Sequence, residues 1–436
     1  MTVIGEVIAR DPFHESTRTS LRVATAGSVD DGKSTLIGRL LHDSKSILED
    51  QLAAVERAST RHGDGSFNLA LLTDGLRAER EQGITIDVAW RYFATPRRSF
   101  VLADSPGHAQ YTRNMVTGAS VSDVAIVLVD ARNGLVEQSR RHAFLAAHLG
   151  VSHIIVAVNK MDLVDWSEDV FASIANEFVA YVDALPRPCP VTAIPISALH
   201  GDNVVDGSDH SDWYAGPTLL DLLETLEPAA ERDLGARLPV QWVIRPRNDT
   251  HHDYRSYAGQ LVGGDLRVGD AVTVLPSGQT TTVASIELGT ESLDQAISGQ
   301  AIAIQLTDDL DVGRGDTIVA SERTRPEAVQ ELEVDVCWMH ERALTPGARV
   351  WVKHTTRTAR AIVTDLVHRL DVNTLALETA PGELQLNDLG RVRLRVSTPL
   401  VVDTYAAHRT TGRLVIIDEA SNATAGAAMI VGPFAH

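Results

Sequence analysis

The pattern of apolar and polar positions divides the chain into two halves. In the first half, short apolar runs rich in β-branched residues alternate with stretches in which apolar positions recur at helical spacing. This alternation is typical of βαβ units and predicts a mostly parallel sheet. The expected strands cover residues 21–25, 99–103, 123–129, 153–158 and 191–195, and the expected helices begin near Lys33, Thr112, Glu137, Ser167 and Thr218.

After about residue 239 the helical period disappears, and short strand-like segments recur between Gly-Gly, Pro-Ser-Gly and Val-Gly-Asp turns. Regular spacing of this kind predicts closed all-β barrels. The first set of expected strands covers 240–244, 258–262, 271–275, 281–286 and 301–306, and the second covers 331–339, 349–354, 360–368, 374–378 and 390–396. The predicted organisation is therefore an N-terminal extension at 1–20, an α/β domain at 21–228, a linker at 229–238, and β-barrel domains at 239–325 and 326–436.

Charge and cysteine content reduce the number of functions that this chain could have. The 436 residues include 39 Lys and Arg against 58 Asp and Glu, which gives a net charge of −19 and disfavours nucleic acid and anionic membranes as partners. The two cysteines are far apart and fit no disulfide framework. The N-terminus has no signal-peptide pattern, and no apolar run is long enough to span a bilayer. We expect a cytoplasmic protein that binds neither membrane nor nucleic acid.

A Gly-x-x-x-x-Gly-Lys-Ser motif lies between the first expected strand and the first expected helix. In such a phosphate loop (P-loop), backbone N–H groups and the helix N-terminus hold a polyphosphate. Lys33 would contact the β- and γ-phosphates, and the Ser34 hydroxyl would bind Mg²⁺. The chain contains only four lysines, so a chance match is rare. The nucleotide-binding residues expected here are Gly27, Ser28, Val29, Asp30, Asp31, Gly32, Lys33, Ser34 and Thr35.

Two further segments fit the phosphate end of the same site. Asp104 ends the strand at 99–103, where its carboxylate would hold Mg²⁺ through water, and the Gly107 N–H would lie beside the γ-phosphate. Thr85 follows Gly83, a residue suited to a hinge, and its hydroxyl can bind Mg²⁺ when GTP is present. The charged run before Thr85, taken alone, is typical of a solvated helix face.

A third segment, Asn159-Lys160-Met161-Asp162, follows the strand at 153–158 and would read the base. The Asp162 carboxylate can accept from both N–H groups on the guanine edge, whereas adenine offers no such donors and would leave a buried carboxylate unpaired. Asn159 would bridge the neighbouring loops, and the stem of Lys160 would lie along the base. Ser197 and Ala198, after the strand at 191–195, would complete the pocket with a backbone N–H. These residues predict GTP as the nucleotide.

The motifs at 27–34, 80–87, 104–115, 159–162 and 197–199 occur in the order that resembles the translation-factor class of GTPases typified by elongation factor Tu. Within that class, the segments at 30–45, 71–93, 112–120 and 213–226 more closely resemble the GTPase subunit of bacterial heterodimeric sulfate adenylyltransferase. The resemblance implies an α/β P-loop GTPase domain followed by two all-β barrels, with GTP and Mg²⁺ as cofactors.

The resemblance also implies a division of labour. A smaller catalytic subunit of the ATP-pyrophosphatase type, in a heterodimer or higher assembly, forms adenylyl sulfate and pyrophosphate from ATP and sulfate, and GTP hydrolysis is coupled to that reaction. It further implies that His108 orients the attacking water, with Thr85 and Lys33 as the other catalytic residues. The alternative is an elongation factor-like GTPase that delivers a charged tRNA, and the net charge of −19 weighs against it.

Overall fold

The computed structural model describes residues 20–44, 88–106, 112–229, 232–246 and 254–434. The chain forms two compact units, Met1–Ala229 and Ala230–His436, which are described separately. No helix in the described residues is long and apolar enough to cross a membrane.

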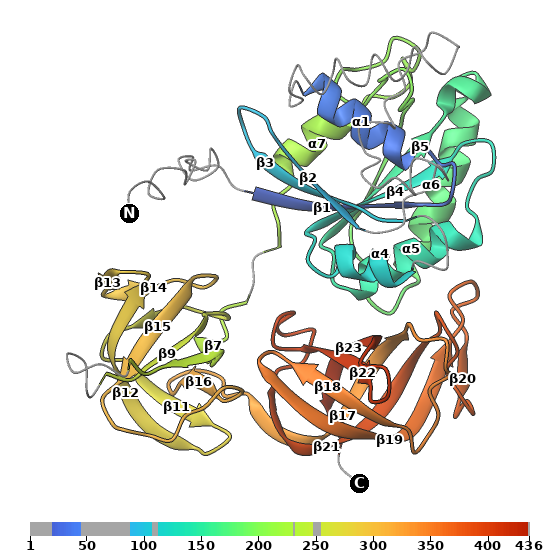
Figure 1. Cartoon of the computed structure of the whole chain (residues 1–436). Coiled ribbons are helices and arrows are strands. Elements are labelled where there is room, and N and C mark those ends of the chain that lie inside the picture. The colour runs from blue at the N-terminus through green and yellow to red at the C-terminus, as the bar shows by residue number, and fades with distance from the viewer. Residues whose placement is uncertain (1–19, 45–87, 107–111, 230–231, 247–253, 435–436) are drawn as a thin grey trace, which may run out of the picture. The chain divides into compact units, whose positions relative to one another are not determined.

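The first unit is built on a six-stranded sheet with the order β2-β3-β1-β4-β5-β6 (Figure 1). Strand β2 pairs antiparallel with β3, and all the other pairs are parallel. The fully buried β4 and nearly fully buried β5 are the apolar runs that the sequence pattern predicts for an interior parallel strand. The strands are β1 (Ser20–Gly27), β2 (Ala89–Ala94), β3 (Ser99–Asp104), β4 (Val124–Asp130), β5 (His153–Asn159) and β6 (Val191–Pro195).

Helices cover both faces of this sheet. Leu36 and Leu40 of α1 and Leu219 of α7 join one apolar cluster with strand residues such as Val23 and Ile126, while α4 and α5 lie on the opposite side (Figure 1). Ser167 and Thr218 cap α6 and α7 by accepting hydrogen bonds from Val170 N and Asp221 N. The helices are α1 (Lys33–Asp43), α4 (Thr112–Ala119), α5 (Glu137–His148), the 3₁₀ helix η4 (Met161–Val164), α6 (Glu168–Asp183) and α7 (Leu219–Thr225).

The parallel order brings the ends of several strands to one edge of the sheet. Gly27 of β1 is in register with Leu128 of β4, and Asp130 of β4 is in register with Asn159 of β5. Asp104 ends β3 beside Thr25. Open α/β sheets bind ligands at this carboxyl edge, and the predicted motif residues follow it.

The second unit begins with a sheet that curls into a barrel. Its order is β7-β16-β11-β12-β15-β9-β8, β13 pairs with β12, and β10 and β14 form a separate ribbon. A bridge between Arg237 of β7 and Val262, two residues after β9, closes the curl. The strands are β7 (Arg237–Pro239), β8 (Trp242–Ile244), β9 (Ser256–Gln260), β10 (Leu266–Arg267), β11 (Ala271–Leu275), β12 (Gln279–Leu288), β13 (Glu291–Leu293), β14 (Gln295–Ala296), β15 (Ala301–Leu306) and β16 (Thr317–Ala320).

The remaining strands form a closed six-stranded barrel. The order β18-β22-β23-β17-β21-β19 returns to β18 through the β18–β19 pair, and β20 is attached to β19. Its interior is filled by apolar residues that alternate along each strand, such as Leu332, Val334 and Val336 of β17. The strands are β17 (Glu327–Trp338), β18 (Arg349–His354), β19 (Arg357–Leu370), β20 (Leu377–Thr379), β21 (Leu389–Val402), β22 (Arg413–Asp418) and β23 (Thr424–Pro433).

A buried ion pair ties the two sheets of the second unit together. Arg237 is 1% exposed, and all five of its N–H donors have acceptors. Nε and Nη2 donate to the two oxygens of Asp403 at 3.0 and 3.1 Å, and the other donors reach the carbonyls of Leu234, Gly235 and Thr324. Complete pairing is what allows a guanidinium to be buried here.

The structure differs from the sequence predictions at one strand in particular. The strand expected at 240–244 begins only at Trp242 of β8, and a separate strand, β7, precedes it: β7 pairs with β16, whereas β8 pairs with β9. Between them Val240 N donates to Asp316 O and Gln241 N donates to Ala258 O, so the chain changes partner there. The expected linker at 229–238 overlaps the first two residues of β7.

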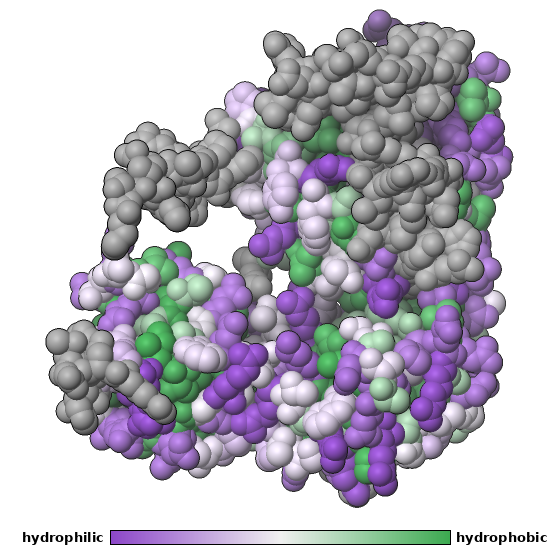
Figure 2. Space-filling view, viewed as in Figure 1, coloured by the Kyte–Doolittle hydropathy of each residue, from purple (hydrophilic) through white to green (hydrophobic). Residues whose placement is uncertain are grey.

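Hydrophilic side chains cover much of the surface seen in Figure 2, and apolar residues are distributed in small groups. Among the most exposed large apolar side chains are Trp242, at 66%, and Tyr92, at 61%, which belong to different units. Scattered apolar residues of this kind are normal for a protein surface.

Candidate nucleotide-binding site

The P-loop joins β1 to α1 and is shaped by Gly32. This residue has φ 94°, and a Cβ atom built there would lie 2.4 Å from Nδ2 of Asn159. A side chain at position 32 would therefore be strained in the backbone and would collide with the base-reading segment. The glycine lets these two segments approach each other.

Lys33 points back into this loop. Its side chain is buried, and Nζ donates to Gly27 O at 2.9 Å and Ser28 O at 2.6 Å. Burial lowers the pKa of Lys33, while Asp31, Asp104 and Asp30 oppose that shift. Burial raises the pKa of Asp31, although its carboxylate accepts from Ser28 N. The loop thus holds a desolvated ammonium at its centre. Its attraction to a negatively charged phosphate oxygen is strongest there, because little water screens the two charges.

Asn159 links three segments of the site. Its Nδ2 donates to Asp31 O at 2.7 Å, and its Oδ1 accepts from Ala198 N at 2.9 Å. The residue is 2% exposed, so both bonds form away from solvent. One amide side chain thereby connects the P-loop, the segment after β5 and the segment after β6.

Lys160 and Asp162 follow Asn159 at the start of η4. Lys160 has a left-handed backbone, with φ 64°, and its Nζ donates to Asp30 O at 2.6 Å and to Asp130 Oδ2 at 2.9 Å. The Asp162 side chain is 19% exposed, and its Oδ2 lies 3.9 Å from His200 Nε2. Ser197 and Ala198 are buried at the end of β6. The structure therefore brings both predicted base-pocket segments, 159–162 and 197–198, to one edge of the sheet.

The residues suggested for Mg²⁺ offer oxygen donors only. Ser34 lies half-buried at the start of α1, and Asp104 is 1% exposed at the end of β3, close enough to Lys33 to act on its pKa. Within the described ranges no group of three or more His, Cys, Asp and Glu side chains could hold a metal ion. A hydroxyl and a carboxylate suit Mg²⁺, which keeps several waters and also takes phosphate oxygens. Thr85, Gly107 and His108 lie outside the described residues.

Sequence reasoning missed three residues at this site: Asp130, Arg132 and His142. Asp130 ends the buried strand β4 in register with Asn159, which is the position that the strand pattern alone marks as the sheet edge. Arg132 donates to both of its oxygens. His142 lies one to two turns into α5 and is 1% exposed, with no sequence signal beyond the helical period of its apolar neighbours.

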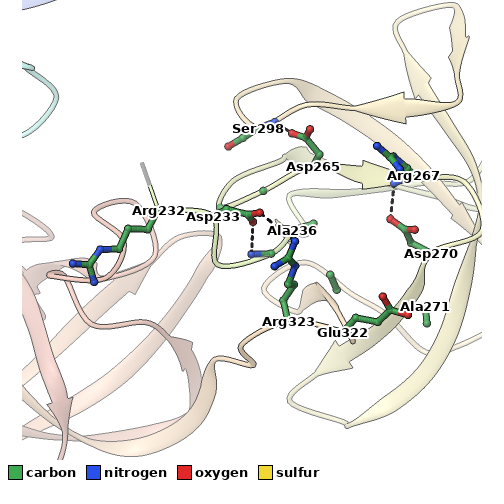
Figure 3. A pocket seen from close by; sticks show the side chains of 14 residues that line it. Arg232, Asp233, Ala236, Asp265, Arg267, Asp270, Ala271, Ser298, Glu322 and Arg323 are labelled. Atoms are coloured by element: carbon green, nitrogen blue, oxygen red, sulfur yellow. Dashed lines mark hydrogen bonds and ion pairs between the residues drawn. The ribbon is translucent and has the colours of Figure 1, made fainter. Parts of the chain in front are cut away.

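A pocket of about 580 Å³ also exists in the second unit (Figure 3). Several of its charged side chains contact one another or nearby backbone. Arg323 lies 3.5 Å from Asp233, and the Arg267 N–H donates to Asp270 at 2.8 Å. The lining residues are Arg232, Asp233, Gly235, Ala236, Gly263, Gly264, Asp265, Arg267, Asp270, Ala271, Ser298, Ala320, Glu322 and Arg323. The motif residues belong instead to the first unit.

Each of the two units contains a segment that matches a known protein family. The elongation factor Tu GTP-binding domain family matches residues 18–229, and the family described as GTP-eEF1A C-terminal domain-like matches residues 331–431. These matches agree with the predicted α/β GTPase domain followed by β-barrels.

Curated relatives cover nearly the whole chain. The bifunctional enzyme CysN/CysC of Mycobacterium tuberculosis is 54% identical over 95% of this chain and 67% of its own length. Sulfate adenylyltransferase subunit 1 of Aliarcobacter butzleri is 49% identical over 96% of this chain and 88% of its own. The protein of the same name from Laribacter hongkongensis is 48% identical over 99% of this chain and 90% of its own length.

Proposed function

Because this chain belongs to the sulfate adenylyltransferase subunit 1 family, we propose that it is the GTP-hydrolysing subunit of a sulfate adenylyltransferase. In this role it couples GTP hydrolysis to the formation of adenylyl sulfate and pyrophosphate from ATP and sulfate. The observation that carries the proposal is the 48–49% identity to two proteins of that name over 96–99% of this chain. The net charge of −19 also favours this function over delivery of a charged tRNA.

The geometry supports guanine nucleotide binding at the carboxyl edge of the first sheet. Lys33 would exchange its bonds to Gly27 O and Ser28 O for contacts to the β- and γ-phosphates, because a buried ammonium gains from a negative partner. Asn159 would hold the P-loop and the segment after β6 in place around the base. Asp162 would accept from the two guanine N–H groups.

The phosphate end would be completed by residues that the family resemblance supplies. Ser34, Thr85 and Asp104, the last through water, would hold Mg²⁺, which neutralises charge that develops on the phosphate oxygens. His108 would orient the attacking water beside the Gly107 N–H. These roles rest on motif position.

The partner would be a smaller catalytic subunit of the ATP-pyrophosphatase type. The subunit 1 names of the relatives support a second subunit. In this division of labour, adenylyl transfer takes place on the partner, and this chain supplies the free energy of GTP hydrolysis.

The test is pyrophosphate release from ATP and sulfate, with and without GTP. The full chain would be assayed alone and after co-expression with candidate catalytic subunits from the same organism. We expect sulfate-dependent release only with a partner, and faster release when GTP is added. The Lys33→Ala variant is the control, since it should abolish GTP turnover and the GTP-dependent gain. If no candidate subunit gives pyrophosphate release, and ribosomes stimulate GTP hydrolysis, the translation alternative would be favoured instead.

A further inference from the structure

The Asp130 carboxylate is saturated by two neighbours. Its Oδ1 accepts from the backbone N–H and from Nε of Arg132, both at 3.0 Å. Its Oδ2 accepts from Nη2 of Arg132 at 2.6 Å and from Nζ of Lys160 at 2.9 Å. A carboxylate offers about four lone-pair sites, so these four donors fill it. The Asp130 side chain is 2% exposed, whereas its partners Arg132 and Lys160 are 48% and 22% exposed.

The carboxylate is charged and its orientation is fixed. Burial raises the pKa of Asp130, but the hydrogen bonds from Arg132 and Lys160 outweigh that effect and hold the pKa far below its ordinary value. The Arg132 guanidinium binds both oxygens at once, which prevents the carboxylate from rotating. Only one direction then remains for a further donor, and Lys160 occupies it.

Lys160 in turn belongs to two parts of the site. Its Nζ bonds to Asp130 and also to the carbonyl of Asp30 in the P-loop. Its side chain is 22% exposed, and its own left-handed backbone comes directly before η4. Fixing this ammonium therefore fixes one wall of the base pocket and one peptide of the P-loop together.

We propose that Asp130 and Arg132 are positioning residues that act through Lys160 and set how long a guanine nucleotide stays bound. Arg132 orients Asp130, and Asp130 holds Lys160 between the base-reading segment and the P-loop. This inference rests on the proposed guanine nucleotide site. Neither residue belongs to the set expected to touch the reacting phosphate, so the effect falls on nucleotide release rather than on hydrolysis.

The experiment measures dissociation of a fluorescent methylanthraniloyl-GDP, chased with excess GDP, from the full chain. For Arg132→Ala we expect dissociation about tenfold faster, because a charge-assisted bond pair to a buried carboxylate is lost. Single-turnover GTP hydrolysis should change by less than about twofold. Arg132→Lys should restore only part of the wild-type lifetime, since a lysine cannot form the fork. Arg97→Ala is the matched control, because Arg97 is 69% exposed and pairs with Glu224 away from the motif residues.

A double-mutant comparison separates this role from simple stabilisation. In a Lys160→Ala background, Arg132→Ala should cause no further acceleration, because its effect passes through Lys160. Additive accelerations would overturn the proposal, and so would a lowered thermal unfolding midpoint with an unchanged release rate. Failure of the wild-type chain to bind any guanine nucleotide would overturn the proposed function as well. Normal binding with wild-type release from Arg132→Ala would overturn this inference alone.

Discussion

His142 is a buried imidazole that the proposed chemistry does not use. It is 1% exposed in α5, its Nε2 lies 2.9 Å from Gln138 Nε2, and its Nδ1 has no hydrogen-bond partner within the described part of the chain. Burial, with smaller contributions from the charges of Lys33 and Arg141, lowers the pKa of His142 to about 3. The first unit therefore contains a histidine that stays neutral well below pH 6.

This residue makes the stability of the first unit depend on pH. In the unfolded chain His142 returns to its ordinary pKa of 6.5, so between pH 6.5 and 3 the unfolded state binds more protons. Stability therefore falls as the pH falls through this window, by about 2 kcal/mol between pH 7.5 and 5. Urea unfolding at the two pH values measures the loss, which His142→Gln should remove. The exposed His210→Gln is the control, and an equal loss in His142→Gln would contradict the assignment.

Asp162 carries the base preference in the proposed site. Asp162→Asn should weaken GTP binding by about 100-fold and allow xanthosine triphosphate to bind, because the amide donates where the carboxylate accepts. Competition between the two nucleotides for the methylanthraniloyl-GDP site measures this exchange. Asp165→Asn is the control, since this neighbour is exposed and asparagine tolerates its left-handed backbone. Unaltered guanine preference in Asp162→Asn would show that another residue reads the base.

Among the elements, helix α7 depends on a single arginine at its end. Arg98 is 4% exposed and lies just before β3, and its Nη1 donates to the carbonyls of Leu223 and Leu226. The last carbonyls of a helix have no partner within the helix, and a cation is favoured there. Arg98 therefore fastens the end of α7 to the sheet edge.

Removing this cap should destabilise the first unit. We expect Arg98→Ala to lower the free energy of unfolding by about 1–3 kcal/mol, since buried carbonyls lose charged donors. Arg97→Ala is the control, because its exposed pair with Glu224, at 3.0 Å, should contribute less than about 1 kcal/mol. Urea unfolding followed by circular dichroism compares the two variants. Equal losses would mean that Arg98 acts as surface charge only.

Strands and helices could be predicted from the sequence where their own pattern of apolar residues shows which side is buried. The interior strands β4 and β5 are continuous apolar runs, and the helices begin within one residue of the expected positions. Strands β22 and β23 were missed, because β23 is rich in alanine and glycine and gains its stability by pairing with β17, far away in the sequence. Strand β2 was missed as well: its exposure alternates, but the exposed positions carry the apolar Trp90 and Tyr92 and the position between them carries Arg91, so its hydropathy does not alternate.

The same distinction applies to the site. The motif spacing predicts which residues meet, because parallel strands end at one edge. The link from Lys160 to Asp130 and the fork of Arg132 follow from side-chain directions after β4 and β5, and no spacing rule contains those directions. The geometry around Asp130 therefore had to come from the structure.

For the molecule as a whole, Arg237 links the two sheets of the second unit, so the stability of that unit depends on it. We expect Arg237→Ala to destabilise this unit by about 3–5 kcal/mol, because Asp403 would stay buried without its partner. Differential scanning calorimetry should show a lowered transition for the second unit. Arg395→Ala, which removes a 55% exposed partner of Glu331, is the control. A small effect in Arg237→Ala would mean that water or a rearranged side chain replaces the pair.

The same arginine sets an order of events during synthesis. Asp403 lies 166 positions beyond Arg237 in the chain. At the usual speed of a ribosome, roughly ten to thirty seconds separate the two residues. During that interval the Arg237 guanidinium of the first barrel lacks its carboxylate partner, Asp403. Arg237 therefore gains its carboxylate partner only after most of the second barrel has been synthesised, so this link between the two barrels forms late in translation.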